Sequence, residues 1–137
     1  MDYARHEAKA HARETMRGIW AAALTPFAPD LSIDEAGFRA NSRHWTRDLG
    51  IAGLFVAGKQ DEFWAMSLGK RKRCMSIAVN ECAGKAGPIL SISDQSVATV
   101  LDLGRHAEVI GADYVIVPAP MLSFCHDRGE VLYRAPP

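Results

Sequence analysis

The feature that most constrains the fold is a regular alternation of short apolar segments with longer helix-forming segments. Each apolar segment has the length and flanking breakers of a strand, and the next one follows about 30 residues later. The predicted strands are 19–24, 51–57, 89–93 and 114–117, and helical patterns lie between them over 32–49, 67–83 and 97–110. This order predicts an α/β fold with about four parallel strands and intervening helices.

Two architectures contain such a repeat, an open doubly wound sheet and part of a (β/α)8 barrel. A nucleotide-binding doubly wound domain usually carries a glycine-rich phosphate loop after its first strand. The segment 25–28 (TPFA) stands there instead, and the sequence contains no Walker lysine loop. We therefore expect no nucleotide and no other cofactor. A flavodoxin-like domain that binds a small ligand at its strand ends remains a lesser alternative.

The charge balance argues against large anionic partners. The 16 Lys and Arg residues equal the 16 Asp and Glu residues, so the chain has no net charge to attract nucleic acid or a membrane surface. The basic run 70–73 (KRKR) lies near the start of a predicted helix, where a run of this kind is more typical of a solvated helix face than of a nucleic-acid site. A small polar substrate is the expected partner.

The cysteines and histidines indicate neither a disulfide framework nor a metal centre. Cys74, Cys82 and Cys125 are odd in number and lack C-x-x-C spacing, and Cys74 and Cys82 fit small buried positions of one helix. The five histidines show no ligand-like pairing on one element. This usage favours a reducing, cytoplasmic compartment.

The amino-terminal segment 1–17 is predicted to be a leader helix or arm. It is charged and contains no apolar signal core, and no apolar run in the chain approaches the length of a membrane span. We therefore expect no membrane partner. The helix over 32–49 is expected to begin at Ser32, because Ser32 and Glu35 have the spacing of a capping box.

The most polar strand-to-helix connection follows the second predicted strand. Gly58 ends that strand, and Lys59, Gln60, Asp61 and Glu62 follow it. In a parallel sheet this connection lies at the carboxyl ends of the strands, where ligands usually bind. The alternative interpretation is an ordinary solvated loop.

Three segments carry a resemblance to a known family. They are 18–34 (GIWAAALTPFxxDxSID), 51–63 (IAGLFVAGKQDEF) with SL shortly after it, and 111–120 (GADYVIVPAP). In their order and spacing they resemble the amino-terminal half of the dihydrodipicolinate synthase and N-acetylneuraminate lyase family, over residues 18–122. The resemblance implies part of a (β/α)8 barrel, usually in a tetramer. It also implies a class I lyase or aldolase, in which a lysine on the sixth strand forms a Schiff base with pyruvate or another 2-oxo acid.

The resemblance assigns a substrate-binding role to the polar turn. The family usually has Gly-Thr-Thr-Gly-Glu here, and its hydroxyls and backbone N–H groups hold the substrate carboxylate. At those places this chain has Lys59 and Gln60, a cation and an amide that are able to donate to a carboxylate. Asp61 stands where the family has glycine, and a positive φ there would suit aspartate better than most residues.

Other family positions differ, so we predict no catalytic residue. The family has a tyrosine pair after the fourth-strand proline, and this chain has Met121 and Leu122 there, neither of which relays protons. Ser123 and His126 are speculative substitutes. None of the lysines Lys59, Lys70, Lys72 and Lys85 matches the Schiff-base lysine, which the family places beyond Pro137.

These observations define one expectation and one rival. We expect residues 18–122 to form a partial barrel and 123–137 an atypical truncated tail, in a Schiff-base lyase or aldolase fragment that is inactive alone. Its expected partners are a 2-oxo acid, bound by Lys59 and Gln60, and further copies of the chain in a homo-oligomer. The rival is a non-catalytic remnant that associates through its exposed sheet edges.

Overall fold

A parallel sheet with helices packed against it forms the centre of the computed structural model, which describes residues 4–84 and 87–118. The strands are β1 (Trp20–Ala22), β2 (Gly53–Val56), β3 (Gly87–Ser91) and β4 (Tyr114–Ile116). The helices are η1 (Arg5–Glu7), α1 (Ala8–Thr15), α2 (Glu35–Arg43), the π-helical turn η2 (His44–Asp48), η3 (Phe63–Ala65), α3 (Leu68–Cys82) and α4 (Val97–Val109). The predicted alternation of strands and helices is therefore confirmed.

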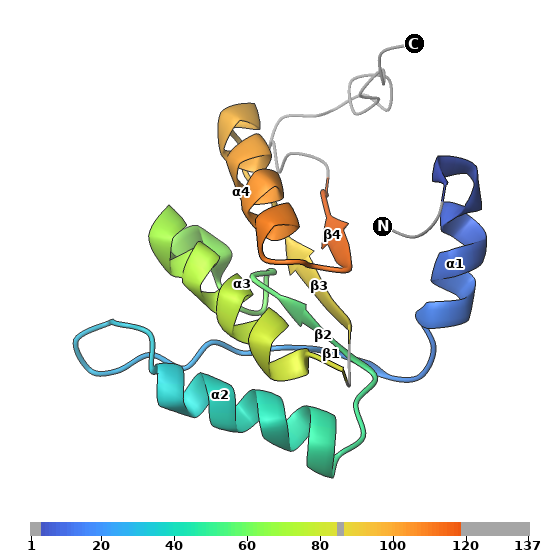
Figure 1. Ribbon diagram of the computed structural model, residues 1–137. Coiled ribbons are helices and arrows are strands. Elements are labelled where there is room, and N and C mark those ends of the chain that lie inside the picture. The colour runs from blue at the N-terminus through green and yellow to red at the C-terminus, as the bar shows by residue number, and fades with distance from the viewer. Residues whose placement is uncertain (1–3, 85–86, 119–137) are drawn as a thin grey trace, which may run out of the picture.

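The order of the strands decides between the two architectures. The sheet order is β1-β2-β3-β4, and every neighbouring pair is parallel. A doubly wound sheet needs a reversal of strand order at a switch point, and the described strands contain none. Helices α2, α3 and α4 lie together on one side of the strands, and α1 stands apart from them beyond β4 (Figure 1). The sheet is therefore wound as in a barrel, and the flavodoxin-like alternative is not supported.

The hydrophobic core lies between the sheet and helix α3. This helix begins at Leu68 because the side chain of Ser67 accepts a hydrogen bond from the backbone N–H of Lys70 at 3.3 Å. Its inward face meets apolar side chains of β2, β3 and α2. The fully buried apolar members of this core include Phe38, Leu54, Val56, Cys74, Met75, Ile77 and Leu90. Side chains of this size each contribute about 1.5–3 kcal/mol by burial. The prediction of buried thiols is confirmed for Cys74 and Cys82, and both are free.

Helix α2 begins three residues later than its predicted cap. The side chain of Asp34, not Ser32, accepts the backbone N–H of Gly37, at 2.9 Å. The hydroxyl of Ser32 instead donates to the carboxylate of Asp30 at 2.6 Å. The capping-box prediction was wrong because Asp30 binds the hydroxyl of Ser32. Asp34 is the next carboxylate along the chain, and it caps the amino-terminal end of α2 instead.

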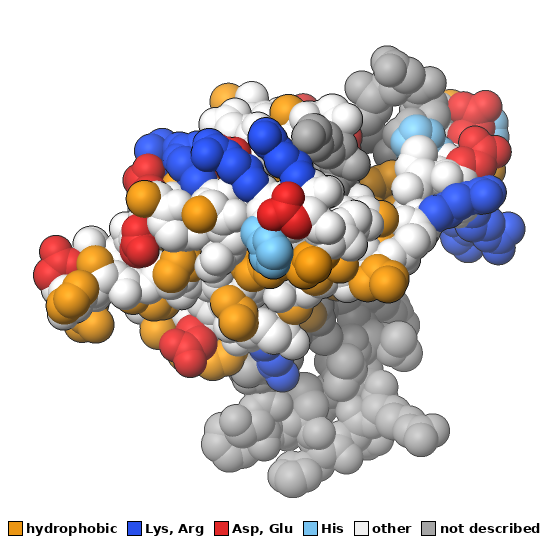
Figure 2. Space-filling model, turned by 90° about the horizontal axis from the view of Figure 1, so that it is seen from below, with side chains coloured by type: hydrophobic (Ala, Val, Ile, Leu, Met, Phe, Trp, Pro, Cys, Tyr) orange, Lys and Arg blue, Asp and Glu red, His pale blue; other side chains and the backbone are white. Residues whose placement is uncertain are grey.

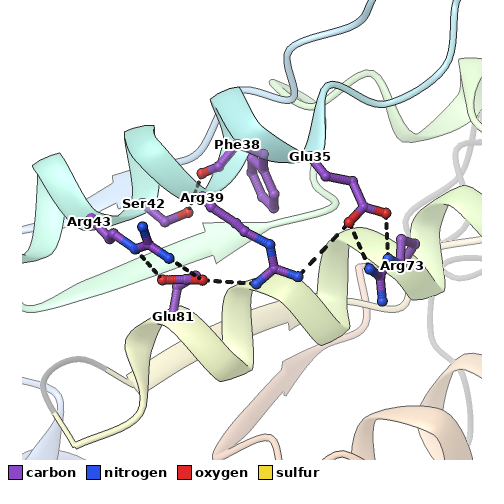
Figure 3. A network of polar contacts seen from close by, with 7 residues as sticks. All are labelled: Glu35, Phe38, Arg39, Ser42, Arg43, Arg73 and Glu81. Carbon is purple, nitrogen blue, oxygen red and sulfur yellow. Dashed lines mark hydrogen bonds and ion pairs between the residues drawn. The ribbon is translucent and has the colours of Figure 1, made fainter.

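Ion pairs join α2 to α3 along their exposed edge (Figure 3). The carboxylate of Glu81 accepts hydrogen bonds from Arg39 at 2.8 Å and from Arg43 at 2.7 Å. About two turns earlier on α3, Arg73 donates to both oxygens of Glu35, at 2.6 and 2.7 Å. Together with the buried ring of Phe38, these contacts fix the two helices against each other.

The tail 123–137, Cys125 and the positions Met121, Leu122, Ser123 and His126 lie outside the described residues. Within 4–84 and 87–118, no helix has the length and apolar character needed to cross a membrane. The face seen in Figure 2 carries basic, acidic and hydrophobic side chains, and several Lys and Arg side chains lie together near its top.

Candidate ligand site at the carboxyl ends of the strands

A cavity of about 790 Å³ opens where the strands end. Its lining comes from β2 and the connection after it, from η3 and the first turns of α3, from β3 and the turn after it, from the start of α4 and from the end of β4. The lining residues include Phe55, Lys59, Gln60, Phe63, Trp64, Arg71, Ser91, Ser93, Asp94, Thr99 and Ile116. The volume lies within the range of small-molecule sites, and apolar walls with a few polar groups are typical of such sites.

Lys59 and Gln60 are exposed residues of the turn after β2, and both line this cavity. Neither side chain makes a hydrogen bond or ion pair with any other described residue. The ammonium group of Lys59 and the amide group of Gln60 are therefore available to donate hydrogen bonds to a ligand. The structure places the two residues at the expected edge of the sheet, and their role in substrate binding stays a prediction.

Aromatic rings form the wall of the cavity next to this turn. The rings of Phe63 and Trp64 pack edge to face with centroids 5.4 Å apart, and Trp64 is 59% exposed. Phe55 lies beneath the turn, where a Cβ added to Gly58 would stand only 2.3 Å from its ring. Gly58 is therefore required by packing, and the backbone of the turn can lie directly on the phenyl ring.

Asp61 belongs to the same turn but points into the protein. It is 2% exposed, and its carboxylate accepts the backbone N–H of Ala57 at 2.5 Å and the hydroxyl of Thr25 at 2.9 Å. Burial raises the pKa of Asp61 to about 6, against the opposing effect of the hydrogen bonds from Thr25 and Ala57. Thr25 follows β1, so this carboxylate connects the ends of two neighbouring strands.

The family pattern suggested a positive φ at Asp61, but the turn has its positive φ angles at other residues. Among the described residues other than glycine, positive φ occurs at Leu31, Ala57 and Glu62. Ala57 has φ +57° and Glu62 has φ +53°, so they flank the turn on both sides. Asp61 itself does not have a positive φ. It serves instead as the acceptor for the N–H of Ala57.

Arg71 is the second buried charged group at the site. It is 3% exposed, and its guanidinium donates to the carbonyl of Ser93 at 2.6 Å and to the carboxylate of Asp94 at 3.0 Å. The ring of Phe63 lies 4.9 Å from the guanidinium carbon. Burial lowers the pKa of Arg71, and the carboxylate of Asp94 opposes that shift. Arg71 thus attaches α3 to the turn after β3.

The basic run 70–73 is therefore not simply a solvated face, as the sequence suggested. Besides Arg71, Lys72 pairs with Asp102 of α4 at 2.7 Å and Arg73 pairs with Glu35 of α2. Lys70 donates to the carbonyl of Leu31 at 2.5 Å. All four basic side chains of the run therefore make contacts within the fold.

Sequence reasoning missed Asp61 and Arg71 as buried residues of the site. The only sequence signal was the departure of Asp61 from a family glycine. Each of them also has a partner far away in the chain, Thr25 for Asp61 and Ser93 for Arg71. The described residues contain no cluster of three or more His, Cys, Asp or Glu side chains that could hold a metal ion.

A parallel sheet whose strands follow one another in chain order, with a cavity at their carboxyl ends, is the arrangement of (β/α) barrels, in which ligands usually bind at that end. Comparison with known proteins gives the family. The chain belongs to the family described as the dihydrodipicolinate synthetase family, whose model matches residues 15–130.

Individual relatives agree with this assignment. A probable 5-dehydro-4-deoxyglucarate dehydratase of Bradyrhizobium sp. (strain BTAi1) is 32% identical over 112 residues, which are 82% of this chain and 35% of that protein. The crystal structure of dihydrodipicolinate synthase from Bacillus clausii superposes with a TM-score of 0.74 at 28% identity, over 81% of this chain and 37% of that one.

A third relative was solved with a ligand. It is a prophage protein of the dihydrodipicolinic acid synthase family from E. coli K12 in complex with pyruvate, with a TM-score of 0.71 at 25% identity, over 75% of this chain and 34% of that one. The chain thus spans little more than a third of the length of these relatives. Since the structural neighbours are TIM barrels, the four described strands are part of such a barrel.

Proposed function

We propose that this chain supplies the carboxylate-binding turn of a Schiff-base lyase or aldolase that acts on pyruvate or another 2-oxo acid. The observation that carries the proposal is the position of Lys59 and Gln60 in the cavity, with no other described residue bound to either side chain. An ammonium and an amide side by side can together hold both oxygens of a carboxylate. Family membership and the pyruvate complex of one relative support the choice of ligand.

In this proposal, the described part of the chain binds the substrate carboxylate, and the amine that forms the imine is not among its residues. Imine formation needs an amine of lowered pKa. Neither Lys59 nor the lysines of α3 occupies the family position of that amine, and Lys70 and Lys72 are already bound within the fold. We therefore propose that this chain by itself binds a 2-oxo acid without forming an imine.

A titration with pyruvate tests the binding step. We expect protein-observed NMR to show pyruvate-dependent shifts of the Lys59 and Gln60 amide signals. Replacing Lys59→Met should weaken pyruvate binding about tenfold, the effect of one lost charge-assisted contact. The matched control is Lys9→Met, because Lys9 is an exposed lysine of α1 outside the cavity lining. Equal affinity of both variants would contradict the proposed site.

Borohydride reduction tests the imine step separately. Treatment of the chain with saturating pyruvate and borohydride, followed by mass spectrometry, should leave every lysine unmodified. A reduced pyruvate adduct on any lysine would overturn the proposal that this chain alone does not form the imine. An adduct on Lys59 in particular would turn a binding residue into the nucleophile.

Assembly and location are further parts of the proposal. Val115 of the edge strand β4 is 47% exposed, which supports a homo-oligomer that covers this edge. Sedimentation velocity measures the mass directly, and a monomer at all concentrations would contradict this part. The buried free thiols of Cys74 and Cys82 support a cytoplasmic setting.

A further inference from the structure

We propose that Asp61 is the positioning residue of the 2-oxo-acid site, because its carboxylate fixes the left-handed backbone at Ala57 and thereby directs Lys59 and Gln60 into the cavity. The inference rests on the proposed function of that turn. Asp61 stands where the family pattern has a glycine, so the proposed role belongs to a residue in which this chain differs from that pattern.

The first step is the geometry of the carboxylate. One oxygen accepts the N–H of Ala57 at 2.5 Å, and the other accepts the hydroxyl of Thr25 at 2.9 Å. The first contact reaches back across the turn, and the second reaches across to the segment after β1. With 2% of its surface exposed, the carboxylate meets these two donors with almost no competition from water.

The second step is the strain that this carboxylate maintains. Ala57 is not a glycine, yet it has φ +57°, a conformation that L-residues other than Asn and Asp rarely adopt. Such a residue persists only where the surroundings over-determine it. The short hydrogen bond from the N–H of Ala57 to a buried carboxylate is a restraint of the required kind.

The third step connects the strain to the ligand. Lys59 and Gln60 lie between Gly58 and Asp61, and no other described residue holds their side chains. Two backbone bonds close the turn, from Asp61 N–H to the Gly58 carbonyl at 3.2 Å and from Glu62 N–H to the Lys59 carbonyl at 3.0 Å. The backbone from Ala57 to Glu62 therefore sets the direction of both side chains. Asp61 fixes this backbone through its hydrogen bonds with Ala57 and Thr25.

Pyruvate affinity and the amide signal of Ala57 together test the inference in the full chain. Asp61→Asn should bind pyruvate at least tenfold more weakly, because a neutral amide oxygen replaces the charged acceptor of the Ala57 N–H. The Ala57 amide proton should move upfield as this hydrogen bond weakens. The control Asp102→Asn removes a carboxylate that pairs with Lys72 and does not line the cavity, and it should leave both readouts unchanged.

A rescue variant separates positioning from a general loss of structure. Glycine adopts positive φ without the penalty of alanine. Adding Ala57→Gly to Asp61→Asn should therefore restore at least part of the lost pyruvate affinity. A merely structural role would not give this recovery, and its absence would overturn the inference.

The remaining outcomes are decisive in either direction. Wild-type binding that depends on Lys59 but is unchanged in Asp61→Asn would overturn this inference and leave the proposed function intact. No pyruvate binding by the wild type would reject both. Should Asp61→Asn lose its dispersed NMR spectrum, Thr25→Val removes one donor only, and undiminished pyruvate affinity in that variant would overturn the inference.

Discussion

The indole ring of Trp20 on β1 lies against Gly53, its register partner on β2, so closely that a Cβ added to Gly53 would stand 2.3 Å from the ring. Gly87, the partner of Gly53 on β3, also lies next to the indole, at 3.5 Å for an added Cβ. The same ring packs edge to face with Tyr114, with centroids 6.2 Å apart. Trp20 therefore covers the amino ends of the neighbouring strands, at the opposite edge from the ligand cavity.

Replacing Gly53→Ala should destabilise the protein by about 1–3 kcal/mol, because the added methyl group overpacks a fully buried position. Urea unfolding followed by Trp fluorescence measures the change. The matched control is Gly69→Ala in the first turn of α3, where an added Cβ meets no atom within 4 Å. That substitution should be neutral or slightly stabilising. An unchanged midpoint for Gly53→Ala would show that Trp20 can move at no cost.

Arg71→Lys should lower the free energy of unfolding by about 2 kcal/mol, although it conserves the charge. A lysine has a single donor group, so it cannot bind Ser93 and Asp94 as the guanidinium does or stack on Phe63. Arg73→Lys, two residues along the same helix, is the control, because the Arg73 side chain is 51% exposed. The prediction fails if the two lysine variants unfold at the same urea concentration.

Glu81→Gln should destabilise the pairing of α2 with α3 by about 1–2 kcal/mol, since a carboxylate bound by two arginines becomes a neutral amide. Hydrogen bonding to Arg43 holds the pKa of Glu81 below its ordinary value of 4.5. The contribution of Glu81 to stability is therefore present above pH 4.5 and is lost as the pH falls through its folded pKa. Glu108→Gln, on an exposed position of α4, is the control in urea titrations at pH 7 and pH 3.

Asp61 should show the opposite dependence on pH. Its pKa is about 6 in the folded protein against an ordinary value of 3.8, so the folded state binds the proton more tightly than the unfolded state does. Its contribution to stability is therefore full below pH 3.8 and is lost as the pH rises to about 6. The difference in unfolding free energy between the wild type and Asp61→Asn should fall by on the order of 2–3 kcal/mol between pH 4 and pH 7. A difference that rises over this interval would contradict the burial of the carboxylate.

The order of elements could be predicted from the sequence because each element carries its own local signals. The apolar runs of the strands and the helix-forming patterns between them are local signals, because each lies within the element that it predicts. The polar turn with Lys59 and Gln60 was found in the same way, since it directly follows a buried strand. Its place at the mouth of a cavity then followed from the parallel topology alone.

The interior of the site could not be predicted in this way. Whether Asp61 points to water or into the protein depends on Thr25, which is distant in sequence and meets it only once β1 and β2 are paired. Arg71 looks like its three basic neighbours in sequence, and only the turn after β3 makes it different. The error at Ser32 was a local one, because Asp30, Ser32 and Asp34 are three competing hydrogen-bonding groups within five residues.

The strand order β1-β2-β3-β4 also has a consequence for how the chain folds during synthesis. Each strand pairs with the one made before it, so no strand has to insert between two that are already joined. At about 10 residues per second, a new strand leaves the ribosome roughly every 3 s, whereas helices form in about a microsecond. We expect the sheet to grow from β1 in the order of translation, with each exposed edge serving as the template for the next strand.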